Sequence, residues 1–471
     1  MLFNSLTFMA FFVIVLIAHQ LMPTWTARKT VLLVASYVFY AAWNPPYVAI
    51  LLFSTSMDWW LARRIWRCDD GPRRKALLIV SLLVNLGLLG FFKYGGFLLA
   101  NFQDAAAALG IVYHPPAWNI LLPVGISFYT FASLSYTIDV YRREIRGDCS
   151  FLDYALFVSF FPHLVAGPIV RASKLLPQIQ QPRQVTRDQL GWGLVLVCIG
   201  LFSKVVLADT VFAPVVDQIY ANPATQSALD TWTGVLGFSG QIYFDFSGYS
   251  LCAIGLALCF GFEFPDNFHA PYAARGFSDF WRRWHMSLSS WLRDYLYIPL
   301  GGNHGGGWLT DRNVMLTMLI GGLWHGASWM FVLWGGLHGI YLVVERHLRA
   351  RATAPMDAPL GSQIPLTMLT FLLVTLTWIP FRAPDMQSVG SVFAGLFRFG
   401  VPSQLEPFQM LLCLAGIGAT IRWQFALRDS SLEERFGKLS SGVQAAILAV
   451  CMVSMFLWSG GDERAFIYFQ F

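Results

Sequence analysis

Two histidines in this chain stand in settings where an imidazole could do chemistry. His325 lies in a long apolar stretch, and the last charge before it is Arg312, thirteen residues earlier. If the stretch is helical, that separation is about 20 Å along the axis, well inside a hydrocarbon core roughly 30 Å thick. An ionisable group at such depth costs about 2.5 kcal/mol or more when charged, and usually marks a site or a pathway. A neutral histidine hydrogen-bonded between two helices is the structural alternative.

His285 lies forty residues before His325, in the segment 277–295, which is rich in aromatic residues and arginines. The aromatic residues recur every three or four positions, which predicts a helix. Arg282 and Arg283 give it charge, so it should lie at the membrane interface or enter a polar funnel. A plain membrane-surface helix, with His285 as one more polar residue, is the alternative. Forty residues are enough to re-enter the membrane once, so both histidines could approach a common passage from different depths.

A buried histidine with a pKa near neutrality can take a proton from a hydroxyl as that hydroxyl attacks an acyl carbonyl, and can then protonate the leaving group. The sequence contains no Gly-x-Ser-x-Gly elbow, no Gly-x-x-x-x-Gly-Lys loop and no His-Glu-x-x-His helix. These absences disfavour a hydrolase, an ATP-driven pump and a metalloprotease. The seven cysteines form no Cys-x-x-Cys pair. This spacing argues against a disulfide framework or a zinc site. We expect no metal and no tightly bound cofactor.

The composition predicts the elements that must position these residues. Of 471 residues, 56% are hydrophobic and 13% charged, whereas soluble domains carry about 25% charged residues. This indicates an all-α, polytopic membrane protein with about ten to thirteen membrane helices, some broken or re-entrant, enclosing a passage. We expect one membrane-embedded domain, with N-terminal helices in 1–118, a catalytic core in 119–346 and C-terminal helices in 347–471. The net charge of +5 is spread over loops, which indicates membrane orientation and not nucleic-acid binding.

The charged loops alternate along the chain. Lysines and arginines occupy the loops around 28–29, 63–75 and 142–146, whereas the loops at 43–47 and 101–118 hold none. By the positive-inside rule the basic loops are cytoplasmic, which puts the N-terminus in the periplasm. The segment 151–167 should then dip into the membrane and return. Its two prolines and its glycine around 160–168 break the helix, and such backbone survives at depth only when it lines protein or a cavity.

Several long motifs closely resemble the membrane-bound O-acyltransferases. The resemblance is to the bacterial branch that acetylates alginate, peptidoglycan and cellulose or transfers D-alanine to teichoic acid, and it runs nearly end to end. The motifs lie at 122–131, 161–169, 243–250, 280–289, 297–303, 322–329 and 466–471.

The resemblance implies roles for both histidines. In the family, the histidine of the Trp-His-Gly motif is the catalytic base, which maps onto His325, and the histidine of the Trp-Arg-Arg-Trp-His motif maps onto His285 as a second functional histidine. Acetyl-CoA as acyl donor is likewise implied by the resemblance. One departure concerns the loop after Gly-Gly-Asn, where relatives often carry basic residues and this chain has a histidine and three glycines at 304–307. No specificity for a carrier protein is therefore inferred.

We expect a further set of residues to contact substrate. They are Trp281, Arg282, Arg283, Trp324, Asp245 and Asn303. For Asp245, an isolated acid between aromatic residues, two roles stay open: lining a tunnel, or pairing with Arg282 or Arg283. His163 is expected to satisfy the broken helix backbone, and His338 to form an interhelical hydrogen bond.

The sequence therefore predicts an O-acyltransferase of the bacterial inner membrane. It would move an acyl group, acetyl by the resemblance, from a cytoplasmic donor across the membrane for O-acetylation of an envelope or secreted polysaccharide, of alginate type. The acceptor would be a hydroxyl on a periplasmic acetyltransferase partner or on the polysaccharide itself. We also expect the protein to contact membrane lipid, and we expect no binding of nucleic acid. Two alternatives remain: a transporter of an acyl donor or lipid-linked sugar with a histidine proton relay, and a scaffold for a secretion complex.

Overall fold

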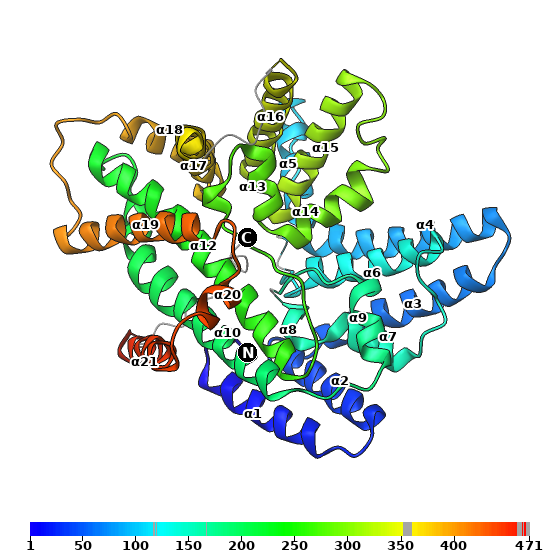
Figure 1. The fold of residues 1–471 in the computed structure, drawn as a ribbon. Helices are drawn as coiled ribbons and strands as arrows, with labels where there is room; N and C mark the ends of the chain where they lie inside the picture. Colours follow the sequence, from blue (N-terminus) through cyan, green and yellow to red (C-terminus); the bar gives the residue numbers. More distant parts are fainter. Residues whose placement is uncertain are drawn as a thin grey trace. The chain divides into compact units, whose positions relative to one another are not determined.

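The computed structural model describes residues 1–471 except 116, 117, 119, 166, 352–359, 459–463, 465 and 468–471. Within the described residues every regular element is a helix, which confirms the all-α expectation (Figure 1). The contacts group the chain into two units, Met1–Val197 with Cys252–Pro265, and Cys198–Leu251 with Asp266–Phe471. The functional division of the sequence at 118 and 346 stays a prediction.

The first unit begins with helices whose starts follow from local sequence. Ser5, Thr24 and Ser150 each accept a hydrogen bond from the backbone N–H three residues later, which satisfies a donor that the helix leaves open. The helices are α1 (Leu6–Leu21), α2 (Trp25–Ala41), α3 (Tyr47–Arg67), α4 (Gly71–Leu89), α5 (Gly95–Ala108), α6 (Ile126–Tyr141), α7 (Phe151–Ser159), α8 (Phe161–Leu164) and α9 (Ala172–Gln180), with a π-helical turn at Gly90–Tyr94 between α4 and α5.

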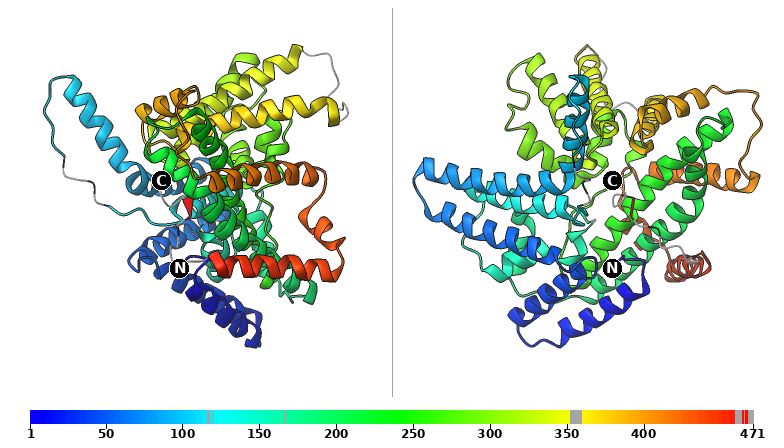
Figure 2. Two further views of the ribbon diagram at one scale, coloured as in Figure 1. Left: turned by 90° about the vertical axis from the view of Figure 1, so that its left-hand side faces the viewer. Right: turned by 180° about the vertical axis from the view of Figure 1, so that it is seen from behind.

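Helices α3, α4 and α6 lie side by side in the first unit (Figures 1 and 2). At one end, Arg74 Nη2 donates to the carbonyl oxygen of Tyr141 at 2.5 Å, so the basic loops 63–75 and 142–146 meet. At the other end, Tyr47 Oη donates to the carbonyl oxygen of Leu121 at 2.5 Å. Loops with many basic residues and loops with none thus gather at opposite ends of α3, the arrangement that the charge pattern predicts. The side on which each end lies stays a prediction.

The helix break expected around 160–168 is confirmed. Helix α7 ends at Ser159, and the four-residue α8 starts again at Phe161, just before Pro162. His163 is buried, and its Nε2 donates to the carbonyl oxygen of Phe157 at 3.0 Å. This histidine satisfies the broken backbone, as predicted.

The second unit holds both histidines of interest. Its elements are the π-helix η2 (Ser203–Phe212), α11 (Ala213–Ala221), the first part of α12 (Ala228–Cys259), a 3₁₀ turn at Pro271–Ala273, α13 (Phe277–Arg283), α14 (Met286–Leu292), a π-helical turn at Arg293–Tyr297, α15 (Gly307–His325), α16 (Trp329–Arg351), α17 (Leu360–Arg382), α18 (Met386–Gly395), α19 (Pro407–Leu427), α20 (Leu432–Gly437) and α21 (Ser441–Trp458). Helix α10 (Arg187–Phe202) leads into η2.

The prediction of one helix over 277–295 is wrong, because the chain breaks between α13 and α14 at Trp284 and His285. His285 has φ +43° and ψ 54°, a left-handed conformation that turns the chain. The aromatic spacing continues on both sides of this turn, so periodicity alone could not reveal it.

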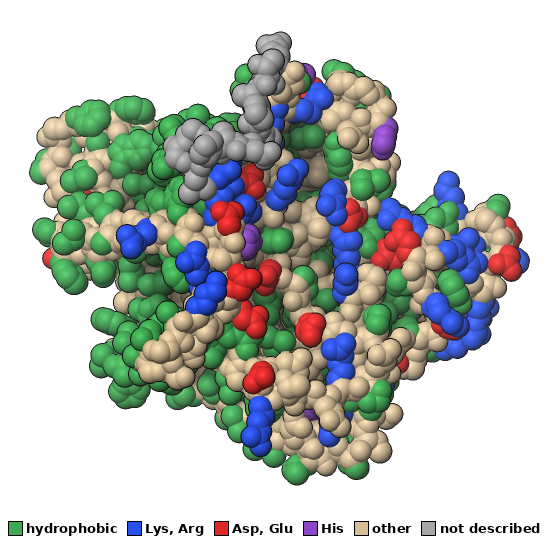
Figure 3. Space-filling view, viewed as in Figure 1, with side chains coloured by type: hydrophobic (Ala, Val, Ile, Leu, Met, Phe, Trp, Pro, Cys, Tyr) green, Lys and Arg blue, Asp and Glu red, His purple; other side chains and the backbone are tan. Residues whose placement is uncertain are grey.

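Six helical stretches within the described residues are long and apolar enough to cross a membrane. They are Gly71–Ala108, Arg187–Ala221, Ala228–Cys259, Gln363–Arg382, Pro407–Leu427 and Ser441–Trp458. Helices α19 and α21 expose apolar side chains such as Phe408, Leu411 and Phe456, and hydrophobic atoms cover this surface in Figure 3. Exposed apolar faces of this kind suit contact with lipid tails. The expected total of ten to thirteen membrane helices stays a prediction.

Candidate active site

His325 is the last residue of α15, and glycines fix where that helix lies against α16. A Cβ atom on Gly322 would lie 2.3 Å from the carbonyl oxygen of Phe331, and one on Gly335 would lie 2.3 Å from that of Met318. Small residues of this kind let two helix backbones approach closely. The close approach sets the position of His325 at the end of the tight helix pair.

The turn that carries His285 is held by Asn267. The Oδ1 atom of Asn267 accepts from Ser287 Oγ at 2.9 Å and from the Ser287 backbone N–H at 3.3 Å, while the Asn267 carbonyl oxygen accepts from Met286 N–H at 2.9 Å. Left-handed backbone costs a non-glycine residue roughly 1–2 kcal/mol. The contacts to Asn267 offset that strain and keep His285 in the turn.

The two histidine rings lie close together. Their centroids are 6.3 Å apart, and the rings are enclosed, with His285 0% and His325 4% exposed. Trp324 touches both, with its ring centroid 5.8 Å from His285 and 5.0 Å from His325. Phe246 meets His285 edge-to-face at 4.6 Å. The expected approach of the two histidines to one place is confirmed; their depth in a membrane stays a prediction.

The enclosure continues from His325 through Trp334 to a third histidine. The ring of Trp334 lies 5.0 Å from His325 and 4.9 Å from His338. His338 Nε2 makes a 2.9 Å hydrogen bond with Thr377 Oγ1 of α17, which confirms the predicted interhelical bond. Trp281 packs on His338 at 5.1 Å. Trp281 therefore lies in the enclosure with Trp324, on the side of His338. The predicted contact of these two residues with substrate stays a prediction.

Several buried nitrogens in this enclosure lack a hydrogen-bond partner within the described part of the chain. They are both ring nitrogens of His285, Nδ1 of His338 and the indole nitrogens of Trp281, Trp334 and Trp378. More than about 90% of buried polar groups in proteins are paired. A concentration of unpaired ring nitrogens beside two enclosed imidazoles is typical of a site that binds a polar group.

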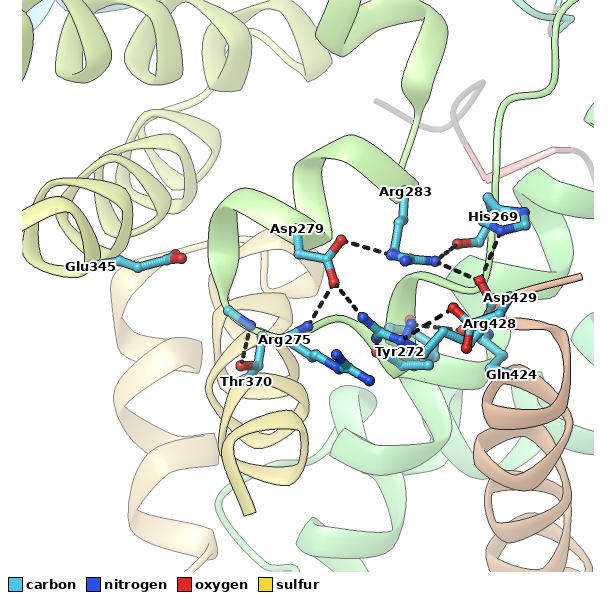
Figure 4. Close-up of polar contacts among 12 residues, drawn as sticks. His269, Tyr272, Arg275, Asp279, Arg283, Glu345, Thr370, Gln424, Arg428 and Asp429 are labelled. Carbon is cyan, nitrogen blue, oxygen red and sulfur yellow. Dashed lines mark hydrogen bonds and ion pairs between the residues drawn. The ribbon is translucent and has the colours of Figure 1, made fainter. Parts of the chain in front are cut away.

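The two neighbouring arginines of α13 have different surroundings, and Figure 4 draws the contacts of Arg283. Arg283 Nε pairs with Asp279 Oδ1 at 2.8 Å, and Arg283 Nη1 donates to the carbonyl oxygens of His269 and Arg428, both at 3.2 Å. Arg282 is exposed. Arg283 is thus committed to holding α13 in place, and Arg282 is the one whose charge faces outward.

Asp279 is the centre of that network. Its Oδ2 accepts from the Arg275 backbone N–H at 2.9 Å and from Arg428 Nη2 at 3.3 Å. Burial alone would raise the pKa of Asp279, but the hydrogen bond from Arg275 and the Arg283 guanidinium outweigh it and hold the pKa below its usual range. Asp279 is therefore a charged anchor for the segment that leads to His285.

The two remaining predicted contacts lie elsewhere in the second unit. Asp245 pairs with Lys204 and not with Arg282 or Arg283. Asn303 is exposed in the turn before α15. That turn is held by Asn313, whose Nδ2 donates to the carbonyl oxygen of Gly302 at 3.0 Å.

Comparison with known proteins places these residues in a family. The model of the membrane-bound O-acyltransferase family matches residues 117–367, a stretch that contains both His285 and His325. The chain belongs to the membrane-bound O-acyltransferase family. It is a multi-pass membrane acyltransferase.

Relatives of this acyltransferase extend the match over most of the chain. The probable alginate O-acetylase AlgI of Pseudomonas aeruginosa is 42% identical over 405 residues, which cover 85% of this chain and 75% of that protein. The probable alginate O-acetylase AlgI of Pseudomonas putida is 37% identical over 503 residues, covering both proteins completely. The peptidoglycan O-acetyltransferase of Helicobacter pylori is 39% identical over 394 residues, which cover 78% of this chain and 73% of that protein.

Sequence reasoning missed several residues of the acyltransferase site. Trp334 and Phe381 both pack on the His325 ring, at 5.0 and 5.5 Å, and Phe246 packs on His285. In an aromatic-rich membrane protein such residues carry no distinguishing signal. Lys204 did carry a distinguishing signal, because it is a lysine inside an apolar segment. An ionisable side chain at membrane depth is costly, and this applies to Lys204 as it does to His325.

Proposed function

We propose that this acyltransferase transfers acetyl groups from a cytoplasmic donor to hydroxyl groups on an envelope or secreted polysaccharide, alginate-type, with His325 as general base. The observation that carries the proposal is the adjacency of His285 and His325, 6.3 Å apart inside the aromatic enclosure. The names of the relatives, which are alginate and peptidoglycan acetylases, support the choice of acceptor class.

The proposed reaction needs no covalent acyl-enzyme. A ring nitrogen of His325 accepts the proton of the acceptor hydroxyl, and the hydroxyl oxygen attacks the acyl carbonyl carbon. The carbon–sulfur bond of the donor thioester then breaks, and the leaving thiolate takes the proton from the imidazolium. His285, whose ring nitrogens are unpaired within the described residues, would hold the donor or the acyl carbonyl.

Acetyl-CoA is the donor substrate that we propose, on family grounds. Its phosphates need cations, and Arg282 suits this role because its side chain is exposed whereas Arg283 already pairs with Asp279. The acceptor hydroxyl would belong to a periplasmic acetyltransferase partner or to the polysaccharide. We place the protein in the inner membrane with a periplasmic N-terminus, on the strength of its charge pattern.

The test uses the purified protein in lipid nanodiscs, with acetyl-CoA labelled in the acetyl group. Release of free thiol and transfer of label to an alginate oligosaccharide are measured for the unchanged protein, for His325→Ala and for His304→Ala. His304 is exposed in the turn before α15 and serves as the matched control. His325→Ala should lower transfer by about 10²–10⁴-fold, the usual contribution of a general base. His304→Ala should not.

Two results would overturn the proposal. If His325→Ala kept half of the original rate, His325 would not be the base. If labelled acetyl-CoA crossed the membrane of a sealed proteoliposome with its thioester intact, the protein would be a transporter, and the histidines would belong to a proton relay.

A further inference from the structure

A buried charge cluster lies on η2 and α12, away from the arginines of α13. Lys204 is in the π-helix Ser203–Phe212, and its side chain is 3% exposed. Its ammonium pairs with Asp245 of α12 and with Asp209 Oδ1 at 2.8 Å. Charges in apolar surroundings persist only when paired, and π-helical turns are often found at functional sites. Both features indicate that the cluster has a structural or functional role.

Arg464 and Ile467, which lie far along the chain, contact this cluster and its neighbour Asp217. The Ile467 backbone N–H donates to Asp245 Oδ2 at 2.9 Å. Arg464 Nη1 pairs with Asp217 Oδ2 at 2.6 Å, and Asp217 Oδ1 also accepts from Arg382 at 3.0 Å. A cavity of about 250 Å³ lies among these groups. Carboxylates thus hold both Arg464 and Ile467.

Phe466 lies between these two residues in the sequence and packs against aromatic side chains of α12. Phe466 is 0% exposed, and its ring lies 4.6 Å from Tyr249 and 5.6 Å from Phe246. Phe246 follows Asp245 directly on α12 and makes the 4.6 Å edge-to-face contact with His285. An unbroken series of contacts therefore joins the carboxylate of Asp245 and the ring of Phe466 to one of the two enclosed histidines.

His285 is unusually dependent on such packing. Neither of its ring nitrogens has a hydrogen-bond partner within the described residues, and its backbone is left-handed. Among the described residues, its aromatic neighbours are therefore what sets the ring orientation. Phe246 has the shortest centroid distance to His285 among those described neighbours.

We propose that Lys204, Asp245 and Asp217, together with Arg464, Phe466 and Ile467, form a latch that positions His285 through Phe246. The latch residues are positioning residues, since the contact through which they act on the histidine is that of the Phe246 ring. The role assigned to His285 rests on the proposed function, but the latch itself does not. Loss of the latch would let the Phe246 ring move and would open His285 to small reagents.

The test compares latch variants with a matched control in the full-length protein in nanodiscs. Arg464→Gln removes one fastening, and Phe466→Leu removes the ring while keeping an apolar side chain. Asp311→Asn is the control, because Asp311, like Asp217, pairs with two basic side chains, Arg346 at 2.7 Å and His347 at 2.9 Å.

The first measurement is the rate at which diethyl pyrocarbonate modifies His285. Trypsin releases residues 284–293 as a peptide with His285 as its sole histidine, and residues 294–312 as a peptide whose sole histidine is the exposed His304, an internal reference. Both latch variants should raise the modification rate of His285 relative to that of His304 by about tenfold or more. A tenfold increase corresponds to a change of about 1.4 kcal/mol in the free energy of exposing the ring. Asp311→Asn should leave the ratio unchanged, and Arg464→Lys should restore it.

The second measurement is acetyl transfer, with kcat and KM for the donor determined separately. Because His285 is proposed to hold the donor or its acyl carbonyl, the latch variants should raise donor KM or lower kcat when both constants are referred to the amount of folded protein. A general loss of folding would lower the amount of active protein and leave both of these constants as they are. Unchanged His285 reactivity in both Arg464→Gln and Phe466→Leu would overturn the latch, whatever happens to activity. Raised reactivity with unchanged kcat and unchanged donor KM would support the latch and remove His285 from the proposed mechanism.

Discussion

Replacing Gly322 with alanine should slow acetyl transfer far more than the same change at Gly321, although the two glycines are neighbours on α15. A methyl group at Gly322 would lie 2.3 Å from the carbonyl oxygen of Phe331 and 3.1 Å from Cα of Gly335, both backbone atoms of α16. A methyl group at Gly321 would meet Leu292 Cδ1 at 3.1 Å, the tip of a flexible side chain. The two substitutions are chemically identical and differ only in what they touch.

The expected size follows from the contact distance. Carbon and oxygen atoms rest about 3.3 Å apart, so α15 and α16 must separate by about 1 Å where Gly322 faces Phe331. His325 lies three residues further along the same helix, and a 1 Å displacement of a reacting group costs about 10²-fold in rate. Alanine favours the helix by about 1 kcal/mol in both variants, so helix propensity cancels in the comparison. Gly321→Ala should stay within about twofold of the original rate, because Leu292 can change rotamer.

The assay is single-turnover transfer of labelled acetyl in nanodiscs, with the unfolding temperature measured in parallel. Gly322→Ala should transfer acetyl much more slowly than Gly321→Ala, and both variants should be folded. Equal rates for Gly322→Ala and Gly321→Ala would show that the spacing of α15 and α16 does not control His325.

Three further outcomes follow from the charge pattern of the loops and from the described contacts. Cysteine placed at Arg73 should react with an impermeant thiol reagent from the cytoplasmic side, and cysteine at Asp104 from the periplasmic side, in a background without reactive cysteines; the reverse pattern would invert the proposed direction of acyl movement. Asn267→Ala should destabilise the protein by about 1–3 kcal/mol and reduce transfer, because the buried donors at the start of α14 lose their acceptor; an unchanged unfolding curve would show that the left-handed turn holds itself. Asp279→Asn should lower the unfolding temperature at pH 7. Because the pKa of Asp279 is held below its usual range, the stabilisation by its charge is present above the unfolded pKa of about 3.9 and is lost as the pH falls through the lower folded value. The difference in unfolding temperature between the variant and the unchanged protein should therefore disappear in acid, and a difference independent of pH would rule out the carboxylate charge as its cause.

The histidine site could be predicted because depth and spacing are visible in sequence. An ionisable residue thirteen positions from the nearest preceding charge stands out in an apolar helix, and a second histidine forty residues earlier leaves room for one return of the chain. The ends of α15 and the break after Ser159 follow from glycine and proline, whose backbone limits are known in advance.

The turn at His285 could not be predicted by the same means. Left-handed backbone at a histidine has no local signal, and it is tertiary contact with Asn267 that stabilises it. The distinction between Arg282 and Arg283 was equally hidden. Adjacent residues on a helix point about 100° apart, so one arginine faces Asp279 while its neighbour is exposed, and only the position of Asp279 and Arg428 decides which.

The partner of Asp245 shows how an argument from depth can be extended. An acid in an apolar segment must find a cation, and the sequence offered Arg282 and Arg283 because they lie in the most conspicuous motif. The structure supplies Lys204, which lies in another apolar segment and also pairs with Asp209 of that segment. Opposite charges on two apolar stretches that are long enough to cross a membrane are each costly alone and stable together. Such pairs therefore predict which helices contact each other, and here the contact joins η2 to the helix that carries Phe246 against His285.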